Sequence, residues 1–215
     1  TKELQDDKEV VLTAVTKNGY SLKFASPRLQ NDKEIVLIAL KTNCFSKNFM
    51  NKDFFQEEEV VLQLFGCGCE SFDSVHISMR ENKNVVNLAV QKNGMELKYA
   101  SKELRDDIGI VLNAVNNNGN ALEFASQRLQ NNKTVVKAAV SKHGASLKYS
   151  AKELRADKEV VLLAVQNKGL VLEFASDNLK SDLEIVKTAC QNDNGQAIYL
   201  ANRELRKNSE LQQYL

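Results

Sequence analysis

The sequence has no tryptophan and a single proline, Pro27, among its 215 residues. So little proline excludes a proline-rich linker and leaves long stretches free to form helices. Lysine and arginine total 29 and aspartate and glutamate 28, so no net field draws nucleic acid or an anionic membrane to the chain. No apolar run approaches the roughly 20 residues of a membrane span, and no secretory signal is recognisable. These absences predict an intracellular protein, in the cytoplasm, without a membrane partner.

Cysteine is also scarce. Cys44, Cys67, Cys69 and Cys190 are too few and too unevenly spaced for a disulfide scaffold, and we interpret them as reduced thiols. Two alternatives stay open for the first three: a Cys44–Cys69 disulfide or other redox role, and a metal site with His76 as fourth ligand. Structural zinc usually takes C-x-x-C pairs, which C-x-C does not match. We therefore expect no metal and no cofactor.

What the sequence has in abundance is repetition, with a period of about 25 residues. A pair of mostly β-branched residues marks each repeat, and a second apolar pair follows four residues later. Positions i, i+1, i+4 and i+5 lie on one face of a helix, so each repeat should bury this face. The first pairs are Val10-Val11, Ile35-Val36, Val60-Val61, Val85-Val86, Ile110-Val111, Val135-Val136, Val160-Val161 and Ile185-Val186. Such repeats stack, because no single unit can bury its apolar face alone.

Each repeat is predicted to contain two helices. Asp, Asn or Glu stands three residues before every β-branched pair, as Asp7 and Asp32 do, where most of these side chains accept from free N–H groups at a helix start. The first helix should run about eleven residues and end at a left-handed glycine cap, as at Asn18-Gly19 and Asn118-Gly119. A second, shorter helix should follow and end at a capping Ser or Asn, such as Ser26.

Neighbouring repeats alternate, so the larger duplicated unit has about 50 residues. Lys98 and Lys148 alternate with Glu123 and Glu173 at one position of successive repeats. If equivalent helices stack in register, these side chains form a ladder of opposite charges between layers. Exposed pairs add little strength, so we expect the ladder to determine which layer follows which.

The pattern predicts an all-α protein, an α-solenoid of about eight helix-turn-helix repeats that form a curved rod. Residues 1–215 should be a single repeat array, with an irregular third-repeat region at 44–80. One extra residue shifts the last unit, and residues 208–215 should form a capping half-helix in which Gln212 faces water. No comparable cap precedes Thr1, so we expect the array to extend upstream.

The motif D-K-E-V-V-x-x-A-V-x-x-x-G-x-x-L-x-F/Y-A-S is clearest from Asp157 to Ser176. On this motif the chain resembles, over nearly its whole length, the tandem repeats of the family called domain of unknown function 4116. The resemblance implies an all-helical repeat protein built from paired units of about the double length seen above. It supplies no catalytic residues to carry over.

Phenylalanine is concentrated in the irregular region. Four of these residues occupy positions that are apolar in other repeats and should lie in the core: Phe49, Phe54, Phe65 and Phe72. Phe55, in contrast, stands at a position that holds polar residues in the other repeats. Phe45 stands at a position that varies among repeats, from Tyr20 to Asn120. Apolar outliers of this kind are typical of interaction anchors, so Phe45 and Phe55 are candidate partner-binding residues. Alternatively, the irregular repeat repacks around both rings.

No short motif of nucleophilic, metal-dependent or phosphate-binding chemistry occurs, such as G-x-S-x-G, H-E-x-x-H or a P-loop. We therefore expect no enzyme but a scaffold whose inter-helix surface binds a protein or peptide segment. One alternative is single-stranded RNA binding, for which a broken lysine column is a partial candidate. The column comprises Lys8, Lys33, Lys83, Lys133 and Lys158, interrupted by Glu58, Ile108 and Leu183. Another alternative is a structural spacer within a longer multidomain protein.

Overall fold

The computed structural model describes residues 1–68, 72 and 75–215. The chain is an all-α repeat protein, and none of the described residues forms a strand. Two compact units, Thr1–Leu88 and Ala89–Leu215, make up the chain. In the described residues, no helix is long and apolar enough to cross a membrane.

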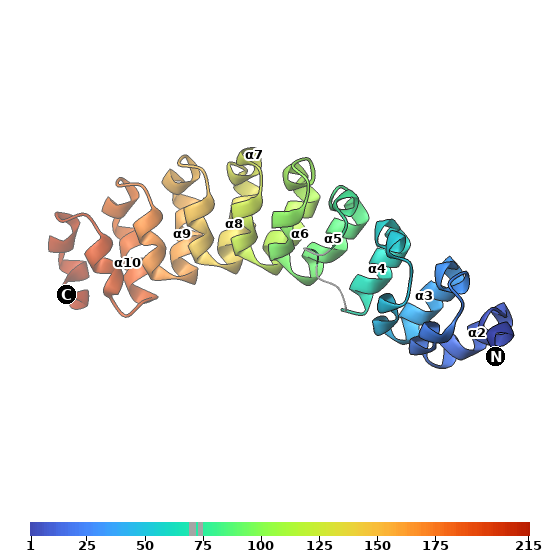
Figure 1. Cartoon of the computed structure of the whole chain (residues 1–215). Coiled ribbons are helices and arrows are strands. Elements are labelled where there is room, and N and C mark those ends of the chain that lie inside the picture. The colour runs from blue at the N-terminus through green and yellow to red at the C-terminus, as the bar shows by residue number, and fades with distance from the viewer. Residues whose placement is uncertain (69–71, 73–74) are drawn as a thin grey trace. The chain divides into compact units, whose positions relative to one another are not determined.

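An α-helix of nine or ten residues forms the first part of each repeat (Figure 1). These helices are α2 Lys8–Lys17, α3 Lys33–Thr42, α4 Glu58–Gly66, α5 Lys83–Lys92, α6 Ile108–Asn117, α8 Lys133–Lys142, α9 Lys158–Asn167 and α10 Leu183–Gln191. Two short α-helices, α1 Lys2–Gln5 and α7 Gln127–Gln130, end individual repeats. The expected length of about eleven residues is therefore close to the observed one.

Among the described residues, most of the rest of the repeats is 3₁₀ helix, so the predicted second helix is present but more tightly wound than an α-helix. The longer 3₁₀ segments are η1 Gly19–Phe24, η3 Cys44–Asn48, η4 Lys52–Gln56, η7 Gly94–Tyr99, η9 Gly119–Phe124, η10 Gly144–Tyr149, η12 Gly169–Phe174, η14 Gln196–Leu200 and η16 Ser209–Tyr214. The shorter ones are η2 Leu29–Asn31, η6 Ile77–Arg80, η8 Leu104–Asp106, η11 Leu154–Ala156, η13 Leu179–Ser181 and η15 Leu205–Lys207.

The helix starts follow the prediction. Asp7 is the N-cap of α2, and its Oδ1 accepts from the backbone N–H groups of Glu9 at 2.9 Å and Val10 at 3.1 Å. Asp32 caps α3 in the same way. These bonds satisfy donors that have no partner inside the helix.

The predicted left-handed glycine caps are wrong. Asn18, after α2, has an extended backbone with φ of −154°, and its side chain starts η1 by accepting from the N–H of Tyr20. Gly19 is required for a different reason, because a Cβ there would lie 1.9 Å from the carbonyl oxygen of Ala39 in the next repeat. The glycine thus lets two repeats approach each other.

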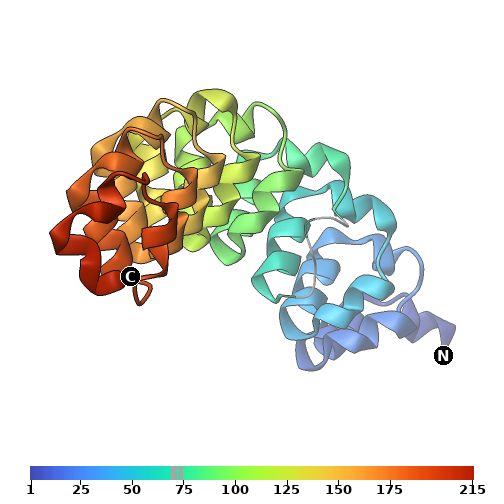
Figure 2. The same cartoon turned by 90° about the vertical axis from the view of Figure 1, so that its left-hand side faces the viewer.

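The apolar face of each long helix from α3 onward lies in the core. In α8, Val135, Val136, Ala139 and Val140 are fully buried, and Figures 1 and 2 show α8 between α6 and α9. The predicted core phenylalanines follow the same rule: Phe54, Phe65 and Phe72 are buried, and the half-buried Phe49 packs against the core.

The last repeat accommodates its extra residue in a tight turn. Asn194 and Gly195 have positive φ values of 58° and 88°, which glycine and asparagine tolerate best. In the final segment η16, Leu211 is buried and Gln212 is exposed. This alternation agrees with a segment that packs against η14 and η15 on one side and meets water on the other.

Candidate functional site

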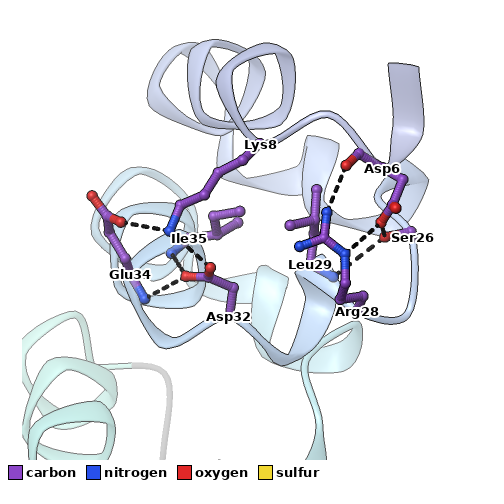
Figure 3. Close-up of polar contacts among 8 residues, drawn as sticks. All are labelled: Asp6, Lys8, Ser26, Arg28, Leu29, Asp32, Glu34 and Ile35. Atoms are coloured by element: carbon purple, nitrogen blue, oxygen red, sulfur yellow. Dashed lines mark hydrogen bonds and ion pairs between the residues drawn. The ribbon is translucent and has the colours of Figure 1, made fainter. Parts of the chain in front are cut away.

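Lysines at the first position of successive α-helices reach across to the next repeat (Figure 3). The ammonium of Lys8 lies 2.9 Å from Asp32 Oδ2 and 2.9 Å from Glu34 Oε2. Asp32 also caps its own helix, since its Oδ1 accepts from the N–H groups of Glu34 and Ile35. One carboxylate thus serves both the helix start and the contact between repeats.

The same arrangement recurs along the array, and we call it the lysine ladder. Its rungs are Lys8 with Asp32 and Glu34, Lys33 with Glu57 and Glu59, Lys133 with Asp157 and Glu159, and Lys158 with Asp182 and Glu184. The ion pair with Lys8 lowers the pKa of Asp32, and the pair with Lys133 lowers the pKa of Asp157. All four lysines are members of the column considered for RNA binding.

Where the lysine column is interrupted, the facing residues change as well. Glu58 replaces lysine, and the side-chain amides of Asn82 and Asn84 donate to its carboxylate, each at 2.8 Å. Ile108 also replaces a lysine, and the positions that hold the two facing acids in the ladder are occupied there by Asn132 and Thr134. Residues of one repeat are therefore matched to those of the next.

The expected alternation of Lys148 with Glu123 and Glu173 is present in weaker form. Lys148 Nζ lies 4.5 Å from the centroid of the Tyr149 ring, and contact with Tyr149 is the main cause that raises the lysine's pKa. The carboxylates of Glu123 and Glu173 raise this pKa further through their charge. The ion pairs of the lysine ladder are closer than this contact.

A second cross-repeat contact joins the ends of neighbouring repeats. Ser26 Oγ and Arg28 Nε both donate to Asp6 Oδ1, and the Arg28 guanidinium also donates to the Asp6 carbonyl (Figure 3). The same three bonds recur in the second unit, where Ser126 and Arg128 bind Asp106.

Beside these junctions lie open hollows on the surface. One, of about 300 Å³, is lined by Pro27, Gln30, Asn31, Phe49, Met50 and Asn51. Another of about 300 Å³ is lined by Lys152, Arg155, Phe174, Ala175, Ser176 and Asp177. Five of the six residues in each lining occupy equivalent positions of different repeats. In each, the ring comes from one repeat and the Gln or Arg from the repeat before it.

The two candidate partner-binding phenylalanines lie in different environments. Phe45 is 62% exposed, as an anchor for a partner requires. Phe55 is only half-buried but packs against the core of the first unit, which matches the alternative that the irregular repeat repacks around it. Tyr20 and Phe24 are also exposed in this unit. Sequence reasoning did not select Phe24, because aromatic residues are common at its position in other repeats.

The cysteines differ from one another. Cys44 is disulfide-bonded, so the expectation of a reduced thiol is wrong there. Cys67 is exposed, and Cys190 is free and buried, with burial raising its pKa to about 11. Cys69 lies outside the described residues, and a redox role of the three candidate thiols stays a prediction. Within the described part of the chain, no three His, Cys, Asp or Glu side chains form a group that could hold a metal ion.

Comparison with family models decides the classification. Four successive segments, residues 7–54, 57–105, 107–155 and 157–209, match the model described as Domain of unknown function (DUF4116). The chain belongs to this family. Each DUF4116 segment spans two of the shorter repeats, which explains why alternate repeats resemble each other most. No curated protein and no solved structure matches the chain.

Proposed function

We propose that this DUF4116 array is a non-enzymatic scaffold that binds a protein or peptide segment in the hollows between its repeats. The proposal is carried by the recurrence of one hollow at equivalent positions, with Gln30 and Phe49 in the first unit and Arg155 and Phe174 in the second. A ring beside hydrogen-bonding groups suits a side chain of a bound segment. Repetition of such hollows suits a segment that follows the array.

Exposed aromatic rings of the first unit support the same proposal. Phe45 and Phe24 are 62% and 60% exposed, and Tyr20 makes an edge contact with Phe49, a ring that lines one of the hollows, at 5.0 Å between centroids. Lys23 Nζ lies 5.1 Å from the Tyr20 ring centroid and 5.0 Å from that of Phe24. Aromatic and cationic groups of this kind are frequent among the residues that dominate protein interfaces.

The lysine ladder argues against single-stranded RNA as the partner. Each of Lys8, Lys33, Lys133 and Lys158 faces two carboxylates of the following repeat. RNA binding needs cations that can neutralise phosphates. These ammonium groups would have to break their ion pairs and bring two acids close to the RNA backbone.

Selection from a library of short random peptides tests the proposal. We expect enriched peptides that bind the purified chain saturably, as measured by fluorescence anisotropy. The variant Phe45→Asn should bind some of them at least about tenfold more weakly. Asparagine is the natural residue at the equivalent Asn120, so the variant should fold, and circular dichroism checks this. A library that yields no saturable binder would contradict the scaffold proposal and favour a spacer.

A further inference from the structure

Two buried hydrogen-bond donors lack partners in the hollow of the second unit. Arg155 Nε and Ser176 Oγ are both buried, and neither has a hydrogen-bond partner among the described residues. The two residues are held together because the Ser176 N–H donates to the Arg155 carbonyl at 2.9 Å. Buried donors without partners cost free energy, and polar groups in native proteins are rarely left so.

The same array shows what the equivalent serine hydroxyls bind elsewhere. Two repeats earlier, Ser126 Oγ donates to the carboxylate of Asp106, as Ser26 does to that of Asp6. The residue equivalent to Asp106 is Ala156, so Ser176 keeps the hydroxyl but has lost the carboxylate. Arg128, which also binds Asp106, is replaced by Asn178. The junctions at Ser26 and Ser126 therefore contain a carboxylate, and the junction at Ser176 lacks it.

We propose that the hollow at Arg155 and Ser176 binds the carboxylate of an aspartate or glutamate in a partner segment. The inference rests on the proposed scaffold function and gives the chemistry of the partner. Arg155 Nε and Ser176 Oγ donate to the carboxylate, and hydrogen bonds to a charged acceptor are stronger than neutral ones. The exposed Lys152 ammonium adds a compensating charge, and Phe174 contacts the methylene groups of the acid.

One acid of the protein itself lines this hollow. The side chain of Asp177 is fully exposed, and its Oδ1 lies 4.0 Å from Lys180 Nζ. Because this carboxylate lies in water, its repulsion of a bound acid is screened. The Asp177 carboxylate does not accept a hydrogen bond from Arg155 Nε or Ser176 Oγ.

The test uses peptides selected on the wild-type chain and, for each, a counterpart in which every Asp and Glu is replaced by Asn and Gln. We expect the acidic form to bind at least about tenfold more tightly. Arg155→Gln should remove most of this difference, and it should fold because glutamine is natural at Gln30 and Gln130. Arg105→Gln is the matched control: Arg105 Nε also lacks a partner, but Ser126 beside it already binds Asp106. This control should leave the preference unchanged.

A second variant supplies the missing carboxylate from within the chain. Ala156→Asp should bind Ser176 as Asp106 binds Ser126, raise the melting temperature and abolish the preference for acidic peptides. If acidic and amide peptides bind equally well, the carboxylate inference fails while the scaffold proposal stands. The contact with the acid would lie elsewhere if Arg105→Gln reduced the preference for acidic peptides as much as Arg155→Gln does. An unchanged preference for acidic peptides in Ala156→Asp would lead to the same conclusion. If no peptide of either kind binds, both proposals fail.

Discussion

The glycines that follow the long helices look like local helix caps, but they are required by contacts with the next repeat. Glycine follows most long helices, and its position suggests a helix cap. The glycines at these positions instead lie at the start of 3₁₀ segments and face a carbonyl of the next repeat. A Cβ at Gly119, for example, would lie 2.3 Å from the Ala139 oxygen, which is closer than atoms can approach without movement of the backbone.

Replacing these glycines should reveal this role. Gly119→Ala is expected to destabilise the fold by about 1 to 3 kcal/mol, because the added methyl group overpacks a repeat junction. Gly109→Ala in α6 is the control and should stabilise it by up to about 1 kcal/mol, since glycine lowers helix stability. Other helices carry Glu9, Glu34 or Glu159 at the position of Gly109, so a side chain fits there. Urea unfolding measures the change in the free energy of unfolding for both variants. Equal changes would contradict a close approach of two repeats at Gly119.

The helix starts were predictable because their hydrogen bonds are local. Asp7 or Asp32 needs only the next few N–H groups of the same chain segment to act as a cap. The second function of Asp32, as a partner of Lys8, could not be read from the sequence alone. It depends on how far apart equivalent helix starts lie in the stack, which packing determines.

Among the elements, equivalent helices differ in how much of their apolar face is covered. Val160 in α9 is fully buried between neighbouring repeats, whereas Val10 in α2 is 43% exposed. Val10 lines a hollow of about 260 Å³ with Leu4 and Phe24, at positions that in later repeats are more deeply covered. The first helix thus contributes less to the core than its sequence suggests.

A pair of identical substitutions tests this difference. Val160→Ala should cost about 2 to 3 kcal/mol, through lost burial of two methyl groups and the cavity left behind. Val10→Ala should cost less than about 1 kcal/mol, because its methyl groups are partly in water and alanine favours helix. The free energies of unfolding in urea are the measurement. A larger cost for Val10 would mean that this face is covered in solution.

The short second helix was predicted in the right place, but its 3₁₀ winding was not predicted. Only about six residues separate the glycine from the end of the segment, as in η1 and η9. Such short helical runs commonly take the 3₁₀ form. The apolar spacing within so few residues fits both forms, so periodicity could not distinguish them.

Across the molecule, charges are balanced between repeats as well as in total. The lysine ladder holds Asp32 and Asp157 ionised, so their pKa values are lower in the folded than in the unfolded chain. Such groups contribute stability above the pKa of an unfolded aspartate, about 3.9, and this contribution is lost as the pH falls through the lower folded value.

The melting temperature should therefore fall between neutral pH and about pH 3. Lys133→Met removes one rung and should show a smaller fall than the wild type, because Asp157 then loses the partner that lowers its pKa. Circular dichroism melts at both pH values make the comparison, and Lys142→Met, at an exposed lysine outside the ladder, is the control. An identical acid response in wild type and Lys133→Met would show that the rung is not formed in solution.

The sequence by itself determined the all-α class, the repeat period, the buried helix face, the helix starts and the DUF4116 membership. Each depends on residue spacing along the chain or on bonds within a few residues. The tertiary structure decided why the glycines are needed, which lysines pair with which acids, that Phe55 packs inward while Phe45 does not, and that Ser176 has a hydroxyl without an acceptor. These features depend on atoms of neighbouring repeats, whose positions are determined by packing rather than by sequence spacing.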